Sequence, residues 1–196
     1  MPTHEETLTL ARYARACIRE ALGGPPAVAP HGAAFDEPGA VFVSLHESGG
    51  RLQGCIGSLE AHRALVDDVA KNARAAALHD PRGRRLELDD VDALEVELTV
   101  LGPLEPIMAD DEAMACAALR PGIDGVVLAW GGRRATFIPQ MWTHFGDDAR
   151  TLLEELKQKA GLPAHFWADD VVLWRYTASI AVDKPFVTET PSADRT

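Results

Sequence analysis

Cysteine is scarce in this sequence, and its arrangement argues against a disulfide-stabilised or zinc-binding protein. Cys17, Cys55 and Cys116 are the only three cysteines; they lie far apart and form no Cys-x-x-Cys pair. A disulfide framework uses an even set of cysteines, so the odd number fits a reducing compartment better. The seven histidines are scattered without His-x-x-x-His spacing, so the sequence predicts no metal site.

The sequence also has no long hydrophobic run and no net positive charge. No apolar run is long enough to cross a membrane, and no basic segment followed by an apolar one marks a secretory signal, so we expect a cytoplasmic protein. The net charge of −11 repels polyanions, and we therefore expect no strong general nucleic-acid binding. A small local groove for RNA stays open as an alternative, with five arginines as its candidate residues: Arg82, Arg84, Arg85, Arg133 and Arg134.

The hydrophobic pattern predicts a mixture of amphipathic helices and short strands. A chain of 196 residues can bury roughly 70% of its unfolded surface, as one domain or two small lobes. Helical spacing and strand alternation of the apolar residues set the expected elements. Helices are expected at about 3–22, 60–79, 110–119 and 149–160, and strands at 40–46, 51–58, 94–101, 125–130, 133–138 and 171–182.

Both halves of the chain show the same expected order of elements: helix, hairpin with a Gly-Gly turn, helix, strand. This order predicts an α+β fold with antiparallel sheets covered by helices, in two lobes that carry an internal duplication. Hairpin–helix–strand units are common, so coincidence would also produce the order, and both explanations stay open. We place lobe one at about residues 1–105, lobe two at about 106–185, and a loose polar tail at 186–196.

The return strand of the first hairpin holds the candidate chemistry. Gly54 and Gly57 flank Cys55, although glycine weakens a strand interior. Cys55 is therefore a candidate nucleophile, with the positive N-terminus of the following helix expected near its thiol and His46 on the partner strand as a candidate base. The alternative is that Cys55 is a small, buried and inert strand residue.

The same strand is also a candidate ligand-binding segment. Exposed backbone amides between Gln53 and Gly57, which include Gly54 and Ile56, would bind a phosphate or carboxylate. Asn72 is a further candidate, because an amide on an alanine-rich helix face must face water or find a partner. Arg82 is the nearest candidate cation after that helix. The alternatives are that the glycines accommodate packing and that the arginine lies in a solvated loop.

Several blocks of the sequence, in order, resemble the AMMECR-one family. They are LQGCIG at 52–57, VAKNARAAA at 69–77, DPR at 80–82, EVELTVL at 95–101, RPGIDG at 120–125, GRRATFIPQ at 132–140 and KAGLP at 159–163. The resemblance runs from about residue 8 to about residue 180. One position departs from the family's Leu-Arg-Gly-Cys-Ile-Gly hallmark: Gln53 stands where the family has arginine, and glutamine is neither a cation nor a bidentate fork.

The resemblance implies an α+β fold with antiparallel sheets in two lobes. It also implies a Memo-like protein and a radical SAM enzyme as partners, in a pathway that modifies RNA bases or a small molecule. It names no reaction, substrate or cofactor. Two functions stay open: an enzyme or enzyme subunit that uses Cys55, and a non-catalytic ligand-binding or adaptor protein that docks a partner enzyme.

Overall fold

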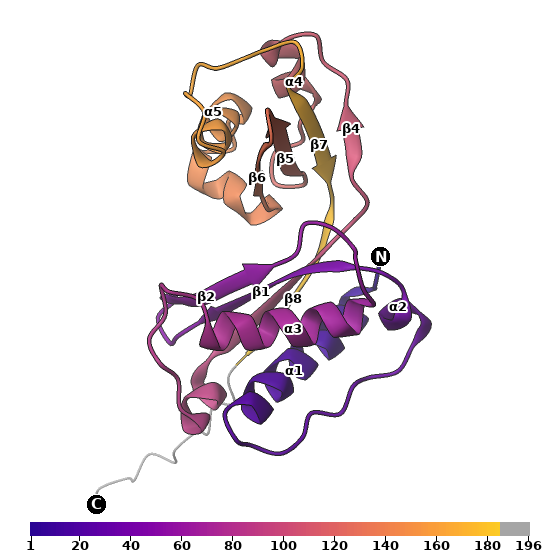
Figure 1. The fold of residues 1–196 in the computed structure, drawn as a ribbon, viewed down its shortest axis with the longest axis vertical. Helices are drawn as coiled ribbons and strands as arrows, with labels where there is room; N and C mark the ends of the chain where they lie inside the picture. Colours follow the sequence, from indigo (N-terminus) through magenta and orange to yellow (C-terminus); the bar gives the residue numbers. More distant parts are fainter. Residues whose placement is uncertain (185–196) are drawn as a thin grey trace, which may run out of the picture. The chain divides into compact units, whose positions relative to one another are not determined.

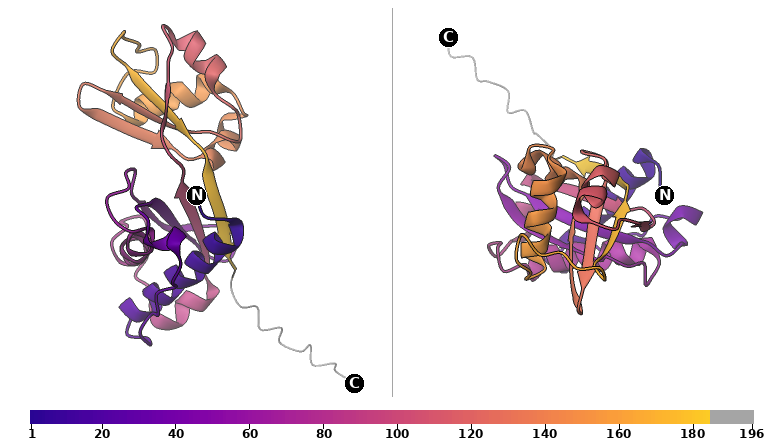
Figure 2. Two further views of the ribbon diagram at one scale, coloured as in Figure 1. Left: turned by 90° about the vertical axis from the view of Figure 1, so that its right-hand side faces the viewer. Right: turned by 90° about the horizontal axis from the view of Figure 1, so that it is seen from above.

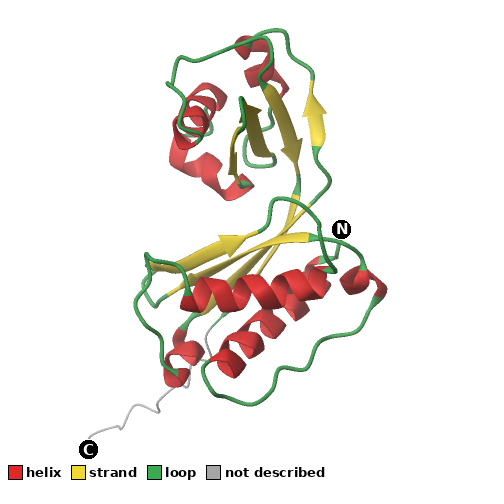
Figure 3. Ribbon diagram, in the orientation of Figure 1, coloured by secondary structure: helices red, strands yellow, loops and turns green. Residues whose placement is uncertain are grey.

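Two antiparallel sheets and their covering helices make up the chain. The computed structural model describes residues 1–184, and the tail expected at 186–196 lies outside the described residues. Over the described range it contains seven helices and two four-stranded sheets, so the α+β prediction is confirmed (Figures 1 and 3). The chain divides into two compact units, one made of residues 1–100 with 179–184 and the other of residues 101–178.

The first unit packs helices on one face of its sheet. Its helices are α1 (His4–Ala21), α2 (Ala33–Asp36), α3 (Leu65–Leu78) and η1 (Leu88–Ala93), and its strands are β1 (Ala40–His46), β2 (Leu52–Gly57), β3 (Glu95–Leu101) and β8 (Ala178–Asp183). The strand order is β2-β1-β3-β8, which leaves β2 at one edge. Alternate β1 residues (Val41, Val43 and Leu45) are fully buried with apolar residues of α1 and α3, as strand alternation requires.

The second unit has its own core. Its helices are α4 (Glu112–Ala118), η2 (Pro139–Phe145) and α5 (Ala149–Lys159), and its strands are β4 (Glu105–Ile107), β5 (Gly125–Trp130), β6 (Arg133–Phe137) and β7 (Val172–Tyr176). The strand order is β4-β7-β5-β6. Trp142 and the α5 leucines Leu152, Leu153 and Leu156 are fully buried in this core.

The two units repeat one topology and exchange one strand. In each unit the hairpin strands and the strand after the covering helix pair in the same order, β2-β1-β3 and β6-β5-β7. The predicted repeat of helix, hairpin, helix and strand is therefore confirmed. The fourth strand of each sheet follows, in sequence, the third strand of the other sheet: β4 follows β3 but pairs with β7, and β8 follows β7 but lies beside β3.

The strand exchange corrects one predicted element. A single strand was expected over 171–182, but β7 ends at Tyr176 and β8 begins at Ala178, in different sheets. The chain passes directly from one to the other (yellow in Figure 2). An apolar run shows that a segment is buried, whereas strand partners are set by tertiary structure. The first compact unit ends at residue 100 and also includes 179–184.

The start of α3 also differs from the prediction. The helix begins at Leu65, after an N-cap residue, Ala64, whose side chain makes no cap. Residues just before it are held in extended form, because Gly39 donates to the Arg63 carbonyl over 3.1 Å and Leu65 donates to the Glu37 carbonyl over 2.9 Å. These bonds to a distant loop delay the helix, and local sequence cannot show them.

Candidate functional site

The outer edge of β2 is closed at Cys55 by an acidic and a basic side chain. The Cys55 N–H donates to Asp80 Oδ2 over 2.8 Å, and Arg82 Nη2 donates to the Cys55 carbonyl over 3.0 Å. Asp80 Oδ1 in turn accepts from Arg82 N (3.0 Å) and Nε (2.9 Å). This Asp80–Arg82 clamp satisfies edge groups that a neighbouring strand would otherwise bind.

The clamp is electrostatically fixed. Arg82 holds the pKa of Asp80 far below its usual range, and the bond from the Cys55 N–H adds to this against the opposing effect of burial. The Asp80 carboxylate is 1% exposed and fully bonded, so it remains charged near neutral pH. It therefore positions the strand and the arginine, and it is unsuited to proton transfer at that pH.

Gln53 binds the backbone of the loop beside the clamp. Its side chain is buried, its Nε2 donates to the Arg84 carbonyl over 2.6 Å, and its Oε1 accepts from the Arg84 N–H over 3.3 Å. A side chain at Gly83 would clash with the Gln53 carbonyl, so the loop lies directly against β2. The Gln53 amide thus pairs with the backbone N–H and C=O of one residue, Arg84, a task that needs one donor and one acceptor.

Packing accounts for both glycines around Cys55. A Cβ on Gly54 would lie closer than 3.0 Å to the carbonyl oxygen of Ala76 in α3, and a Cβ on Gly57 would overlap the Phe42 ring. The glycines therefore allow a helix backbone and an aromatic ring to approach the strand closely. This is the packing alternative that the sequence left open.

The expected position of the α3 N-terminus near the thiol is wrong. Cys55 and its neighbour Gly54 lie against Asp80 and Ala76, which belong to the C-terminal end of α3 and the residues that follow it. The N-terminal half lies at the other end of β2, where Ser58 Oγ donates to Asp68 over 2.8 Å. A helix that follows a strand through a short connection runs back along it, so its first turn meets the strand's last residue.

The thiol of Cys55 lies on the sheet face opposite α1 and α3. Ser44, directly across the hairpin, donates its hydroxyl to Cys55 Sγ over 3.2 Å. Cys55 is half-buried, whereas Cys17 is fully buried. Burial raises the pKa of both Cys17 and Cys116, which favours their protonated forms.

The remaining predicted residues fall into separate places. His46 lies opposite Leu52, beyond a register shift in the hairpin, and no hydrogen bond joins it to Cys55 within the described chain. Ile56 packs against the core of the first unit. Thus the side chains of Gln53 and Arg82 lie beside Cys55 at the edge of β2. Gly54, Ile56 and Gly57 belong to the same strand but serve packing, and His46 and Asn72 lie elsewhere.

Asn72 belongs to a buried network at the far end of β2. Its Nδ2 lies 3.1 Å from the Val41 carbonyl, 3.0 Å from Asp68 Oδ2 and 3.2 Å from Ser58 Oγ. Asp68 also accepts a hydrogen bond from the Val41 N–H over 3.2 Å, and it forms an ion pair with Arg63. The network fastens α3 to the start of β1 and to the end of β2.

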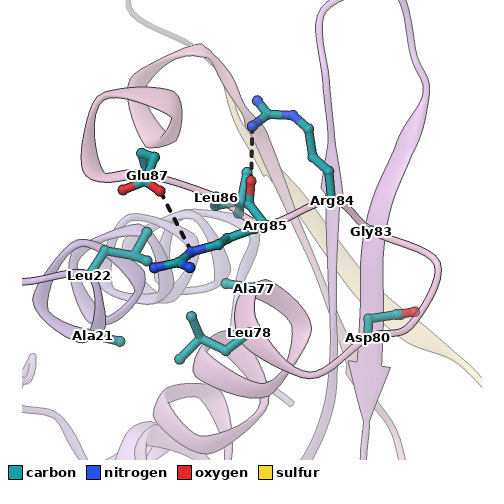
Figure 4. A pocket seen from close by; sticks show the side chains of 10 residues that line it. All are labelled: Ala21, Leu22, Ala77, Leu78, Asp80, Gly83, Arg84, Arg85, Leu86 and Glu87. Atoms are coloured by element: carbon teal, nitrogen blue, oxygen red, sulfur yellow. Dashed lines mark hydrogen bonds and ion pairs between the residues drawn. The ribbon is translucent and has the colours of Figure 1, made fainter.

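The loop that carries the clamp also borders a cavity of about 530 Å³ (Figure 4). The cavity lies among the C-terminal ends of α1 and α3 and the chain after α3. Its lining comprises Ala21, Leu22, Ala77, Leu78, Asp80, Gly83, Arg84, Arg85, Leu86 and Glu87. Arg85 faces Glu87 across it at 3.6 Å, and both side chains are largely exposed. Cys55 is outside this lining.

Sequence reasoning missed two contributors to the site. Ser44 was available as the one hydroxyl in an apolar strand, but its pairing with Cys55 depends on the hairpin register. Asp80 was visible as a charged loop residue, without its bond to the strand edge. Residues 1–184 contain no cluster of three or more His, Cys, Asp or Glu side chains suited to a metal ion, and no helix long and apolar enough to cross a membrane.

The chain is similar in sequence to several archaeal proteins and in structure to a crystal structure of one of them. A protein of Methanothermobacter thermautotrophicus is 34% identical over 184 residues, which cover 91% of this chain and 94% of that protein. Protein MJ0810 of Methanocaldococcus jannaschii is 33% identical over 181 residues, covering 91% and 90% respectively. The crystal structure of the uncharacterized protein PH0010 from Pyrococcus horikoshii is similar with a TM-score of 0.83 and 31% identity, covering 92% of this chain and 97% of that one. The AMMECR1 family matches residues 11–181, and the chain belongs to that family.

Proposed function

We propose that this protein is an enzyme or enzyme subunit that acts through the thiol of Cys55 on an electrophilic carbon of a small molecule or an RNA base. The observation that carries the proposal is the bond from Ser44 to Cys55 Sγ. A hydroxyl that donates to sulfur stabilises the thiolate, which is the reactive form. Cys55 as a residue is also only half-buried, whereas Cys17 is fully buried.

The clamp supports the same role by holding the nucleophile in place. Both polar groups of the Cys55 peptide are bonded, to Asp80 and to Arg82, so the strand is held at the reacting residue. Preorganisation of this kind removes the entropy of positioning from the reaction. In the proposed step the thiolate forms a bond to carbon as a leaving group departs with the electron pair. The thiol proton is released to solvent in this step; His46 stays a predicted base, although no hydrogen bond joins it to Cys55 within the described chain.

The proposed setting is a modification pathway shared with a Memo-like protein and a radical SAM enzyme. That part of the proposal rests on the family resemblance. The charge pattern favours a small ligand over extended RNA, because Arg82, Arg84 and Arg85 each form an ion pair with a neighbouring carboxylate. A paired arginine contributes less to a phosphate-binding surface than an unpaired one.

A non-catalytic ligand-binding or adaptor protein is the second candidate. It is favoured by the structural tasks of three predicted site residues: Gly54, Gln53 and Asn72 each serve packing or backbone bonding. In that case the segment around Cys55 would shape a docking surface for a partner enzyme.

Replacement of the chromosomal copy by Cys55→Ser distinguishes the two functions. Cys116→Ser is the matched control, because Cys116 is also partly exposed but has its pKa raised by burial. Mass spectrometry of modified nucleosides and small metabolites should show a product lost in Cys55→Ser and kept in Cys116→Ser. An unchanged profile, together with unchanged co-purification of partners, would support the adaptor and refute the enzyme.

A further inference from the structure

Two of the three nitrogens of the Arg82 guanidinium are hydrogen-bonded within the protein, and the third is not. Its Nε and Nη2 bind Asp80, and Nη2 also binds the Cys55 carbonyl. Its third nitrogen, Nη1, makes no hydrogen bond or ion pair with any residue in the range 1–184. The side chain is 57% exposed, so the two N–H groups of Nη1 are available to a ligand.

The neighbouring Arg84 provides the contrast. Its Nε binds Glu47 over 2.8 Å, its Nη1 binds Asp90 over 2.9 Å and the Arg85 carbonyl over 3.1 Å, and its Nη2 binds Asp90 over 2.8 Å. All three nitrogens are in use, so Arg84 is a structural cation. Arg82 differs because its Nη1 donors have no partner in the range 1–184, and because it is bonded to Cys55, which carries a thiol.

Arg82 and the Cys55 thiol belong to the same small region. The guanidinium is bonded to the carbonyl of the residue whose side chain is the thiol. The pKa of Arg82 is raised, mainly by its hydrogen bond to Asp80 and to a smaller extent by the nearby Cys55 side chain. A small molecule that touches the sulfur can therefore reach the guanidinium as well.

We propose that Arg82 binds an anionic group, a carboxylate or a phosphate, of the molecule that reacts at Cys55. The inference rests on the proposed function and gives it a substrate class. Asp80 fixes the guanidinium before the ligand arrives, so little side-chain entropy is lost on binding. Asp80 also offsets part of the positive charge, so the expected selectivity is modest.

Two alkylating reagents of equal mechanism and different charge test this inference. Iodoacetate and iodoacetamide both react when the thiolate forms a sulfur–carbon bond and iodide leaves with the bonding electrons, but only iodoacetate is an anion. The measured quantity is the ratio of the two rate constants at Cys55, from peptide mass spectrometry of the intact protein. Normalising by iodoacetamide removes any general change in thiol reactivity or exposure.

Arg82→Gln should lower the iodoacetate-to-iodoacetamide ratio by about three- to fivefold, and Arg82→Lys should restore part of it. Arg85→Gln is the matched control, because Arg85 is an exposed arginine of the same unit that does not contact Cys55. Its ratio should equal that of the unmodified protein. Added salt should lower the ratio in the unmodified protein, since an exposed charge interaction is screened.

The outcomes distinguish failure of this inference from failure of the proposed function on which it rests. If Cys55 reacts readily but its ratio is the same in Arg82→Gln, the anion inference is overturned and the proposed function stands. If Arg82→Gln slows iodoacetate and iodoacetamide equally, the ratio of their rate constants is unchanged. This result also overturns the inference, because it shows only that the substitution displaced the strand. A Cys55 that resists both reagents overturns the proposed function and the inference together.

Discussion

Substitution of Gly54 by alanine tests whether the first glycine of the hallmark strand is there for packing. The added Cβ would lie closer than 3.0 Å to the Ala76 carbonyl oxygen and 3.1 Å from its carbonyl carbon, while Asp80 Cβ lies 3.3 Å away. Ordinary contact begins at 3.4 Å, so α3 and β2 must separate by about 1 Å. A gap of that size removes about a quarter to a half of the dispersion attraction across it.

The expected loss of stability follows from the nature of the obstacle. Overpacking a core destabilises by about 1–3 kcal/mol, and a rigid helix backbone cannot turn away as a flexible side chain can. We therefore expect a loss of about 3 kcal/mol for Gly54→Ala, with a fall in Tm of at least about 6 °C. Thermal unfolding followed by circular dichroism and calorimetry measures both.

Gly32→Ala is the control for this substitution. Its Cβ would meet only ring carbons of Phe35 at 3.3 and 3.4 Å, in a backbone conformation open to any residue. The expected loss is under about 1 kcal/mol, the size of a weakened helix cap. If Gly54→Ala melts within 2 °C of the unmodified protein (a limit set by about 1 kcal/mol), the close approach of α3 is not what requires glycine, and an open ligand-binding ledge regains support.

Three further changes test the networks around β2. Asn72→Ala should lower the free energy of unfolding by about 2 kcal/mol, because it removes a buried donor that bonds both the Asp68 carboxylate and the Val41 carbonyl, the latter keeping only its bond from the Ser58 N–H; a loss below about 0.5 kcal/mol in urea titration would contradict this. Ser44→Ala should slow iodoacetamide labelling of Cys55 by about two- to fivefold, and an unchanged rate would show that the hydroxyl does not stabilise the thiolate. Asp80 has a lowered pKa in the folded protein, so its contribution to stability is complete above the unfolded value of about 3.9 and is lost as the pH falls through the lowered folded value. The gap in stability between the unmodified protein and Asp80→Asn should therefore narrow from pH 6 to pH 3, whereas a gap independent of pH would refute the assignment (both values chosen to bracket about pH 3.9).

Local signals in the sequence were sufficient for most of the secondary structure. The capping box of Thr3 and Glu6 starts α1 as predicted, because both of its hydrogen bonds lie within four consecutive residues. The apolar run from Ala40 to His46 gives β1 with the predicted bounds, since most of its side chains are buried. The strand exchange could not be predicted, because β7 and β8 form one continuous pattern and only tertiary pairing separates them.

The candidate site was predicted in composition but not in geometry. Cys55 and Arg82 were recognised as residue types suited to nucleophile and anion contact, and the structure brings their residues together. The role of Gln53 was invisible, because an amide can serve a ligand or a peptide group equally well. The position of Cys55 relative to α3 was wrong for a geometric reason, the reversal of direction between a strand and the helix that follows it.

The most direct test of the account compares the three cysteines of the folded protein in one experiment. Limited labelling with iodoacetamide at neutral pH, followed by peptide mass spectrometry, gives a separate rate for Cys17, Cys55 and Cys116. The account predicts that Cys55 reacts at least about tenfold faster than either of the others, because burial keeps both of those in the thiol form. Equal and slow labelling of all three would contradict it.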